Sequence, residues 1–258
     1  MISLKNSIVC ITGASSGIGA ACAASFAREG SKLILVARRR SRLDEMAKKL
    51  AGQHGTSIFT GELDVRKQKA VEVFFNALPA EWKPIDILVN NAGLSRGLVK
   101  LHEGKTEDWD EMIDTNVKGL LYVTRAVLPS MIERNTGHVV NIGSIAGQQT
   151  YPAGNVYSAT KFAVTGITRS LKMDLLGTAV RVSSVDPGLV ETEFSEVRFH
   201  GDKERAAKTY AGMTPLRAED VADAVVFCAT RPPHVNINEI SMTSIHQASV
   251  TMVHRTGV

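Results

Sequence analysis

Short runs of apolar residues alternate along the chain with longer stretches in which apolar residues recur at helical spacing. Most runs are apolar almost throughout, as expected of strands covered on both faces: SIVCIT from Ser7, KLILVA from Lys32, SIFTGELD from Ser57, DILVN from Asp86, HVVNIG from His138, VRVSSV from Val180 and, more weakly, EISMTSI from Glu239. Candidate helices lie between them, around 17–29, 40–53, 67–78, 107–134, 155–176 and 219–230. This alternation predicts an α/β fold, a doubly wound parallel sheet of about seven strands with helices on both faces.

No linker, composition shift or repeat divides the chain, so we expect one domain over residues 1–258. The least regular segment, 192–216, is polar and broken by Gly201, Gly212 and Pro215. Because it follows the sixth strand, we expect it to form a substrate lid. Two arrangements stay open for the tail, about 234–258, which either crosses to another subunit or frays.

The composition mainly excludes certain partners and kinds of site. Net charge is only +4, which does not by itself imply nucleic acid or a membrane surface. The three cysteines form no CxxC pair and read as buried small hydrophobes, and the seven histidines show no metal-ligand spacing. No signal peptide or membrane span is apparent, so we expect a cytoplasmic protein without a metal.

Immediately after the first strand, the segment TGASSGIG places Gly13, Gly17 and Gly19 at the start of a helix, with Ser15 and Ser16 between them. Glycines let backbone approach a pyrophosphate closely, and a helix N-terminus supplies free N–H groups. The spacing differs from G-x-G-x-x-G, but the position after the first strand favours phosphate binding over simple packing. We therefore expect a Rossmann-type nucleotide site.

The second strand ends in VARRRSR, without the acidic residue that would hold a ribose 2′-hydroxyl. Arg38 and Arg39 suit a 2′-phosphate instead, which points to NADP(H), whereas we expect Arg40 and Arg42 to face solvent. The alternatives are a solvated basic cluster or RNA binding. RNA binding is disfavoured because no aromatic residues are interleaved with the arginines.

Tyr157 and Lys161 lie four residues apart in a predicted helix and so share one face. A nearby ammonium lowers the pKa of a phenol, which would make Tyr157 a usable acid or base. Ser144 follows the strand HVVNIG, at the sheet edge where ligands bind, and could hydrogen-bond a substrate carbonyl. A lone YxxxK is usually structural, but its combination with Ser144 and the glycine loop favours chemistry.

These motifs resemble the short-chain dehydrogenase/reductase family over nearly the whole chain. TGASSGIG at 12–19, NNAG at 90–93, Asn116 in DTNVKG, Ser144, YSATK at 157–161 and DPGLVET at 186–192 occur in family order. The resemblance implies a catalytic tetrad of Asn116, Ser144, Tyr157 and Lys161. Tyr157 would protonate the carbonyl oxygen, Ser144 would polarise it, Lys161 would lower the tyrosine pKa and hold the nicotinamide ribose, and Asn116 would anchor a water.

The resemblance also implies how NADP(H) is held. The glycine loop would meet the pyrophosphate, Asp64 and Val65 the adenine, Asn91 a ribose, and the segment after the sixth strand the nicotinamide. The expected cofactor-binding residues are thus Gly13, Ser15, Ser16, Gly17, Ile18, Gly19, Arg38, Arg39, Asp64, Val65, Asn91, Ala92, Gly93, Tyr157, Lys161, Pro187, Gly188, Val190 and Thr192.

Within the family, the chain is most similar to NADP-dependent serine and 3-hydroxy acid dehydrogenases. That similarity implies a small-molecule substrate such as serine, L-allo-threonine or 3-hydroxyisobutyrate, or malonic semialdehyde in reverse, bound by Ser144 and Tyr157. Arg198 is our candidate to hold the substrate carboxylate, with Arg96 as the alternative. Sulfoacetaldehyde reduction, general carbonyl reduction and a non-catalytic NADPH sensor stay open. The family implies a homo-oligomer, dimer or tetramer, formed through helices near 107–134 and 155–176.

Overall fold

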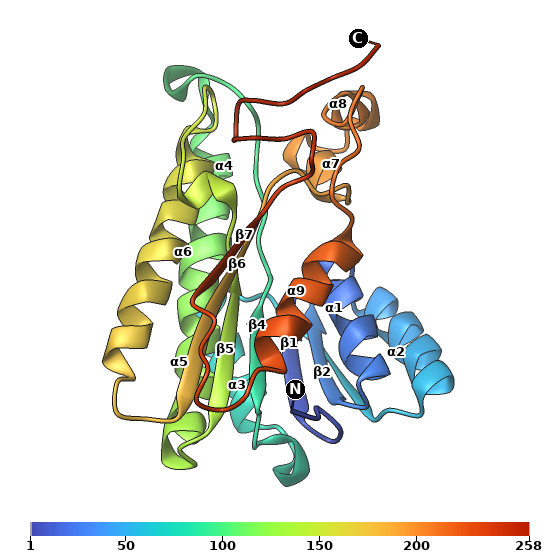
Figure 1. Ribbon diagram of the computed structural model, residues 1–258, viewed down its shortest axis with the longest axis vertical. Coiled ribbons are helices and arrows are strands. Elements are labelled where there is room, and N and C mark those ends of the chain that lie inside the picture. The colour runs from blue at the N-terminus through green and yellow to red at the C-terminus, as the bar shows by residue number, and fades with distance from the viewer. Residues whose placement is uncertain (1, 258) are drawn as a thin grey trace.

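The centre of the molecule is a seven-stranded sheet in the order β3-β2-β1-β4-β5-β6-β7, in which every pairing is parallel (Figure 1). The computed structural model describes residues 2–257. The strands are β1 (Ile8–Thr12), β2 (Lys32–Ala37), β3 (Ile58–Glu62), β4 (Ile87–Asn90), β5 (Gly137–Ile142), β6 (Val180–Pro187) and β7 (Glu239–Met242). The predicted fold class is confirmed. The strand order reverses between β1 and β4, and a sheet of this kind binds ligands at that point, beyond the carboxyl ends of its strands.

Helices cover both faces of the sheet. They are α1 (Gly17–Arg28), α2 (Arg40–His54), α3 (Gln68–Asn76), α4 (Thr106–Ile113), α5 (Leu120–Glu133), α6 (Asn155–Asp174), α7 (Phe194–Arg198), α8 (Lys203–Lys208) and α9 (Ala218–Ala229). Short 3-10 turns η1 (Ala80–Trp82), η2 (Leu101–Glu103) and η4 (Ile145–Gly147) and a π-helical turn, η3 (Asp114–Gly119), complete the regular structure.

Two apolar cores lie on opposite sides of the sheet because strand side chains alternate between its faces. Val9 and Ile11 of β1 pack with residues of α1, α2 and α9. Ile8 and Cys10 of the same strand pack with residues of α3 and α5. Both cores continue through the neighbouring strands, which explains why the strand segments are apolar almost throughout.

One predicted helix is interrupted. The pattern over 107–134 predicts a continuous helix, but the structure has α4, then η3, then α5 in direct succession. Each π-type hydrogen bond spans one more residue than an α-helical bond, so the ladder continues with a local change of phase. Asn116 lies in this π-helical turn and is one of its buried residues.

The chain after β6 folds back over the carboxyl edge of the sheet. The predicted lid segment contains the short helices α7 and α8, and the tail passes beside them (Figure 1). Arg255 Nη2 donates to the Thr209 carbonyl at 2.9 Å, and Thr256 N donates to the Gly212 carbonyl at 2.8 Å. The tail supplies β7 and is bonded to segment 192–216 of its own chain, called the lid segment or lid below, rather than frayed.

Cys10, Cys22 and Cys228 are free and buried in the two cores, as predicted. Burial raises the pKa of the Cys10 and Cys22 thiols to about 12, so these side chains act as small hydrophobic groups.

Across residues 2–257, no helix combines the length and the apolar character needed to cross a membrane.

Candidate active site

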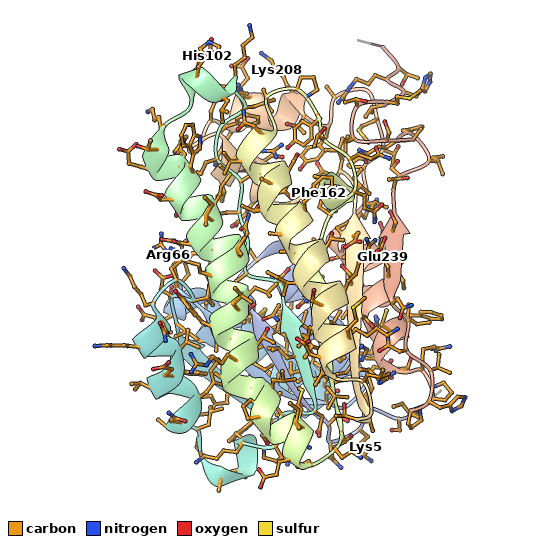
Figure 2. The ribbon with its side chains drawn as sticks, turned by 90° about the vertical axis from the view of Figure 1, so that its left-hand side faces the viewer. Lys5, Arg66, His102, Phe162, Lys208 and Glu239 are labelled. Atoms are coloured by element: carbon orange, nitrogen blue, oxygen red, sulfur yellow. The ribbon has the colours of Figure 1, made fainter. Side chains whose placement is uncertain are left out.

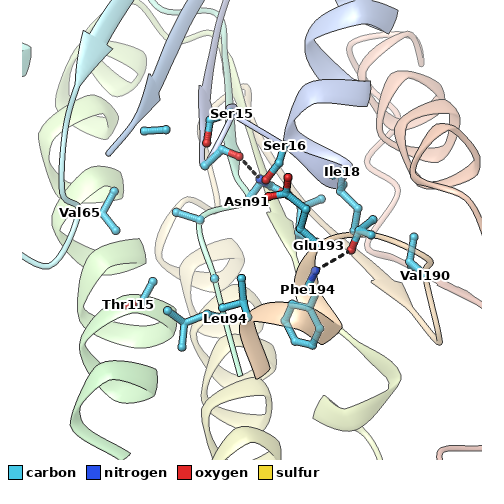
Figure 3. Close-up of a pocket in the computed structure, with 18 of the residues that line it drawn as sticks. Ser15, Ser16, Ile18, Val65, Asn91, Leu94, Thr115, Val190, Glu193 and Phe194 are labelled. Atoms are coloured by element: carbon cyan, nitrogen blue, oxygen red, sulfur yellow. Dashed lines mark hydrogen bonds between the residues drawn. The ribbon is translucent and has the colours of Figure 1, made fainter. Parts of the chain in front are cut away.

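A cavity of about 310 Å³ lies at the carboxyl edge of the sheet, between the glycine loop, the ends of β2 and β4, and the lid. Figure 3 shows Ser15, Ser16 and Glu193 close together, with Phe194 next along the chain from Glu193. The structure brings most of the predicted residues into this wall: Gly13, Ser15, Ser16, Gly17, Ile18, Arg38, Arg39, Asp64, Val65, Asn91, Ala92, Gly93, Ser144, Tyr157, Lys161, Pro187, Gly188, Val190 and Thr192. Gly19, Asn116 and Arg198 do not line the cavity themselves, but each contacts a residue that does.

The glycine loop needs its glycines for two different reasons. Gly13 and Gly17 adopt φ values of 64° and 51°, in the left-handed region that disfavours side chains. Gly19 instead makes a close approach, because a Cβ there would lie 2.5 Å from Asn91 Nδ2 and from the Gly13 carbonyl oxygen. The loop can therefore pass tightly from β1 into the N-terminus of α1, where free N–H groups face the cavity.

Thr12 and Asn91 fasten this loop to the end of β4. The Thr12 hydroxyl accepts hydrogen bonds from the backbone N–H groups of Asn91 at 3.0 Å and Ala92 at 2.9 Å. The Asn91 amide donates to the Thr12 carbonyl at 2.9 Å and to the Gly13 carbonyl at 3.2 Å. NNAG thus supports the glycine loop. Sequence reasoning missed Thr12, whose one signal was a hydroxyl at the end of an apolar strand.

Arg40 and Arg42, the two arginines expected to face solvent, are both about half exposed, at 49% and 46% of the side chain. Arg40 pairs with Asp44 at 2.9 Å on the surface of α2. Arg42 instead turns toward the lid and meets Glu193 Oε1 at 2.5 Å. Arg39 meets Glu193 Oε2 at 2.8 Å and also donates from Nη2 to the hydroxyl of Ser16 at 2.6 Å. Sequence reasoning missed Glu193, since nothing local connects it with arginines so far away in the chain.

Arg38 lies toward a different carboxylate, Glu111 of α4, at 3.6 Å. Glu111 also pairs with Arg66 at 3.3 Å and with Arg96 at 2.7 Å. Although partial burial acts in the opposite direction, the Arg96 hydrogen bond and the charges of Arg66 and Arg38 hold the pKa of Glu111 below its usual value. One carboxylate thus serves three guanidinium groups between the end of β2 and the lid.

The chemistry of this end fits a phosphorylated dinucleotide. Arg38 and Arg39 follow β2 where an NAD-binding fold would carry an acid, and both line the same cavity as the glycine loop. Asp64 is paired with Arg66 at 2.7 Å. The carboxylate of Glu193 on Arg39 shows directly that an anion can sit at this guanidinium.

Tyr157, Lys161 and Ser144 converge from α6 and the end of β5. Lys161 Nζ donates to the Ile142 carbonyl at 2.9 Å and lies 6.0 Å from the centroid of the Tyr157 ring. Ser144 caps η4 by accepting a hydrogen bond from Ala146 N at 3.1 Å. Ser144, the second residue after β5, is thus a hydroxyl residue at an N-cap, where serine is favoured.

The pKa of Tyr157 departs from the expected direction. Burial raises it, and the opposing influences are the charge of Arg198 and the hydroxyl of Ser144. The expected lowering by Lys161 is therefore not what this structure shows, because desolvation dominates. Burial also lowers the pKa of Lys161 itself to about 8, against the opposing charge of Asp186. Asp186 is buried in turn, and burial raises its pKa to about 6.

Asn116 is 2% exposed and has every polar atom engaged. Its Oδ1 accepts from Leu94 N at 2.8 Å, and its Nδ2 donates to the Leu94 carbonyl at 2.8 Å and to Thr160 Oγ1 at 3.0 Å. The side chain therefore ties the segment after NNAG to α6.

Arg198, at the end of α7, lies over the aromatic side chains of the site. Its Cζ is 5.2 Å from the centroid of Tyr157 and 5.4 Å from that of Phe194. Nε donates to Ser95 Oγ at 3.0 Å and Nη2 to Tyr151 OH at 2.7 Å. Sequence reasoning missed Ser95, Tyr151 and Phe194, which position this guanidinium.

Arg96, the alternative anion holder, points elsewhere. Its Nε bonds Glu111 and its Nη1 donates to the Val197 carbonyl of α7. Gly97 N donates to the Arg198 carbonyl at 2.8 Å beside it. Arg96 therefore fastens the lid to α4, and Arg198 is the arginine next to Tyr157.

Comparison with known proteins agrees with this geometry. Residues 7–203 match the family described as short chain dehydrogenase, and the chain belongs to that family. It is 50% identical to the NADP-dependent 3-hydroxy acid dehydrogenase YdfG of Escherichia coli (strain K12) over 250 residues, 96% of this chain and 99% of that one. It is 43% identical to an NADP-dependent 3-hydroxy acid dehydrogenase of Schizosaccharomyces pombe over 256 residues, 99% of each chain.

Among solved structures, the chain resembles the closed form of serine dehydrogenase complexed with NADP+. The TM-score is 0.91 at 50% sequence identity, over 96% of this chain and 99% of that one. An alcohol dehydrogenase from the archaeon Thermococcus sibiricus, complexed with 5-hydroxy-NADP, gives a TM-score of 0.83 at 31% identity, over 94% and 98%. The family expected from the motifs is confirmed, and the protein is an oxidoreductase.

Proposed function

We propose that the protein is an NADP-dependent oxidoreductase that transfers a hydride between NADP(H) and the hydroxyl-bearing carbon of a small 3-hydroxy acid. The observation that carries the proposal is the position of Arg198, whose guanidinium carbon lies 5.2 Å from the centroid of the Tyr157 ring. Tyr157 lines the same cavity as Arg38 and Arg39. Relatives at 50% identity that bear the name NADP-dependent 3-hydroxy acid dehydrogenase support both the cofactor and the substrate class.

NADP, when bound, supplies the hydride acceptor, and NADPH the donor. The N-terminus of α1 and the hydroxyls of Ser15 and Ser16 would hold its pyrophosphate, and Arg38 and Arg39 its 2′-phosphate. The remaining roles follow family order: the adenine against Asp64 and Val65, the riboses near Asn91, Tyr157 and Lys161, and the nicotinamide near Ala92, Gly93, Pro187, Gly188, Val190 and Thr192.

The chain's own residues manage the proton. Tyr157 removes the proton from the substrate hydroxyl in oxidation and returns it to the carbonyl oxygen in reduction. Ser144 donates a hydrogen bond to that oxygen as its charge develops. Lys161, whose pKa is lowered to about 8 by burial, supplies a cation that stabilises the phenolate when the site is charged. Asn116 keeps the segment carrying Leu94 in place, and we also assign to it the anchoring of a relay water.

Arg198 would hold the substrate carboxylate. A guanidinium presents two parallel N–H donors to a carboxylate, and this one is already oriented by Ser95 and Tyr151. A sulfonate carries the same charge, so sulfoacetaldehyde reduction is the nearest competing activity. A neutral ketone would make no use of Arg198.

The first experiment measures initial rates of NADP reduction with L-allo-threonine, serine, 3-hydroxyisobutyrate and isethionate, with NAD in parallel. Turnover of a 3-hydroxy acid with NADP supports the proposal, and turnover of isethionate alone moves the protein to sulfonates. Failure on all four directs the search to neutral carbonyl compounds. An NADPH sensor would bind the nucleotide without turning over any substrate.

Two variants test the assigned roles. Tyr157→Phe should abolish turnover while NADPH binding and the unfolding midpoint are kept, and wild-type turnover would remove Tyr157 from the acid/base role. Arg198→Met, which keeps an apolar chain of similar length, should raise KM for an anionic substrate by about 10- to 100-fold, the loss of a charge-assisted pair. Unchanged KM would place the anion elsewhere.

We also propose that the chain is one domain with its lid at about 192–216, and that it works in the cytoplasm as a homotetramer or homodimer, without nucleic-acid or membrane partners. Support for assembly comes from apolar side chains on the outer surface of α4, α5 and α6. Ile113 is 40% exposed, Leu121 42% and Phe162, labelled in Figure 2, 43%. Sedimentation of the wild type and of Phe162→Glu tests it, since a monomeric wild type would contradict the proposal.

A further inference from the structure

Glu193 is the residue that joins the lid to the arginines of the nucleotide end. It stands immediately before α7, and its carboxylate meets Arg39 at 2.8 Å through one oxygen and Arg42 at 2.5 Å through the other. Hydrogen bonds from Arg39 and Arg42 hold the pKa of Glu193 below its usual value, so the carboxylate is charged throughout the neutral range.

The same guanidinium is also part of the glycine loop. Arg39 Nε and Nη2 lie 3.2 and 3.1 Å from the Ser15 hydroxyl, and Nη2 lies 2.6 Å from that of Ser16. Glu193, Arg39 and both serines line one cavity, and Figure 3 shows the Glu193 side chain beside Ser16. A carboxylate of the lid therefore occupies the anion position that the end of β2 offers to a phosphate.

We propose that Glu193 competes with the 2′-phosphate of NADP(H) for Arg39. Glu193 thereby sets both the affinity of the site for the phosphorylated cofactor and the rate at which that cofactor dissociates. This inference rests on the proposed function, because it takes Arg39 to be the 2′-phosphate ligand. When NADP(H) binds, the phosphate replaces the Glu193 carboxylate on Arg39. When the nucleotide leaves, the carboxylate re-forms its ion pairs with Arg39 and Arg42.

The competition affects one cofactor only. A 2′-phosphate is an anion and can exchange with a carboxylate on a guanidinium, whereas NAD(H) carries a neutral hydroxyl there and leaves the ion pairs intact. Glu193 therefore weakens NADP(H) binding and leaves NAD(H) binding unchanged. It also speeds release of the phosphorylated cofactor, because the departing phosphate is replaced by a waiting carboxylate rather than by water alone.

The test is Glu193→Gln, which keeps the shape of the side chain and removes its charge. Its matched control is Glu191→Gln, an exposed carboxylate of the same loop that forms no ion pair within residues 2–257. The probes are NADPH and NADH, followed by their own fluorescence on binding, with dissociation rates from stopped-flow displacement. No substrate is needed for either measurement.

We expect Glu193→Gln to lower the Kd of NADPH by about 3- to 10-fold, mostly through a slower dissociation rate, since each partly exposed ion pair is worth a modest factor. The Kd of NADH should change by less than about 2-fold, and Glu191→Gln should leave both constants as in the wild type. The gain should shrink when Arg39→Gln is added, because the contested guanidinium is then absent.

Two results would overturn the inference. Equal weakening of NADPH and NADH in Glu193→Gln would make Glu193 a clamp that merely closes the lid. No change in either would make its ion pairs incidental. The proposed function fails in a different way, when the wild type shows no preference for NADPH over NADH and Arg39→Gln affects both alike.

Discussion

Asn116 gives the sharpest test of how the structure supports the active site. Asn116→Ala removes three hydrogen bonds at once, and two of them are to the backbone N–H and carbonyl of Leu94, a residue only 4% exposed. The third partner, Thr160, keeps its bond to the Tyr157 carbonyl at 2.7 Å. The cost of the substitution therefore arises mainly at Leu94.

Its magnitude follows from the two unpaired backbone groups. A buried polar group that loses its partner costs about 1–3 kcal/mol, so Leu94 alone accounts for about 2–6 kcal/mol, less any relief from water entering the space. We expect Asn116→Ala to lower the free energy of unfolding by about 2–4 kcal/mol. For a chain of this size that corresponds to a fall in Tm of roughly 5–15 °C.

The assay is equilibrium unfolding in urea, followed by circular dichroism. Thr160→Val is the comparison variant, because it removes the bonds of the Thr160 hydroxyl to Asn116 and to the Tyr157 carbonyl while Leu94 keeps both of its bonds, and the expected cost is about 1–2 kcal/mol. An Asn116→Ala protein within about 0.5 kcal/mol of the wild type would refute the reasoning, since surface substitutions alone vary by that much.

Two further predictions concern Asp186. Gly143→Ala should destabilise the protein by about 1–3 kcal/mol, because a Cβ on Gly143 would collide with Asp186 Oδ1. The control is Gly166→Ala, which adds a methyl group in open space on α6 and should stabilise the protein by about 0.5–1 kcal/mol. Thermal melts of both variants check this. Burial raises the pKa of Asp186 to about 6, so its protonated form favours the folded state below pH 4, and that stability is lost as pH rises through 6. The free energy of unfolding of Asp186→Asn, relative to that of the wild type, should therefore rise by about 3 kcal/mol between pH 4 and pH 7. Urea unfolding of both proteins across that range measures this difference. A difference that does not change with pH would contradict the prediction that a charge is buried at Asp186.

The parts of the fold that could be predicted are those with a local signal. The apolar runs at β1 and β2 fix the strands because both faces are covered, and Gly13 and Gly17 mark the turn because their φ values exclude side chains. Tyr157 and Lys161 could be paired because helical spacing places them on one face. Each of these inferences uses residues within one turn or one strand.

The parts that could not be predicted depend on contacts between distant segments. Glu193 reaches Arg39 across 154 positions and Arg198 reaches Ser95 across 103, and no spacing rule connects such residues. The direction of the pKa shift at Tyr157 was also hidden, because burial is a property of the folded surroundings. The π-helical turn at Asn116 could not be predicted because its sequence is typical of an ordinary helix.

The shared carboxylate of Glu111 has a consequence for anyone who redesigns this enzyme. Arg38, which follows β2, and Arg96, which follows β4 and contacts α7, both pair with it, so a change to one redistributes the charge available to the other. Substitutions chosen separately for cofactor preference and for substrate range will therefore not combine additively. Libraries for this protein should vary both ends together, with Glu111 as a position of its own.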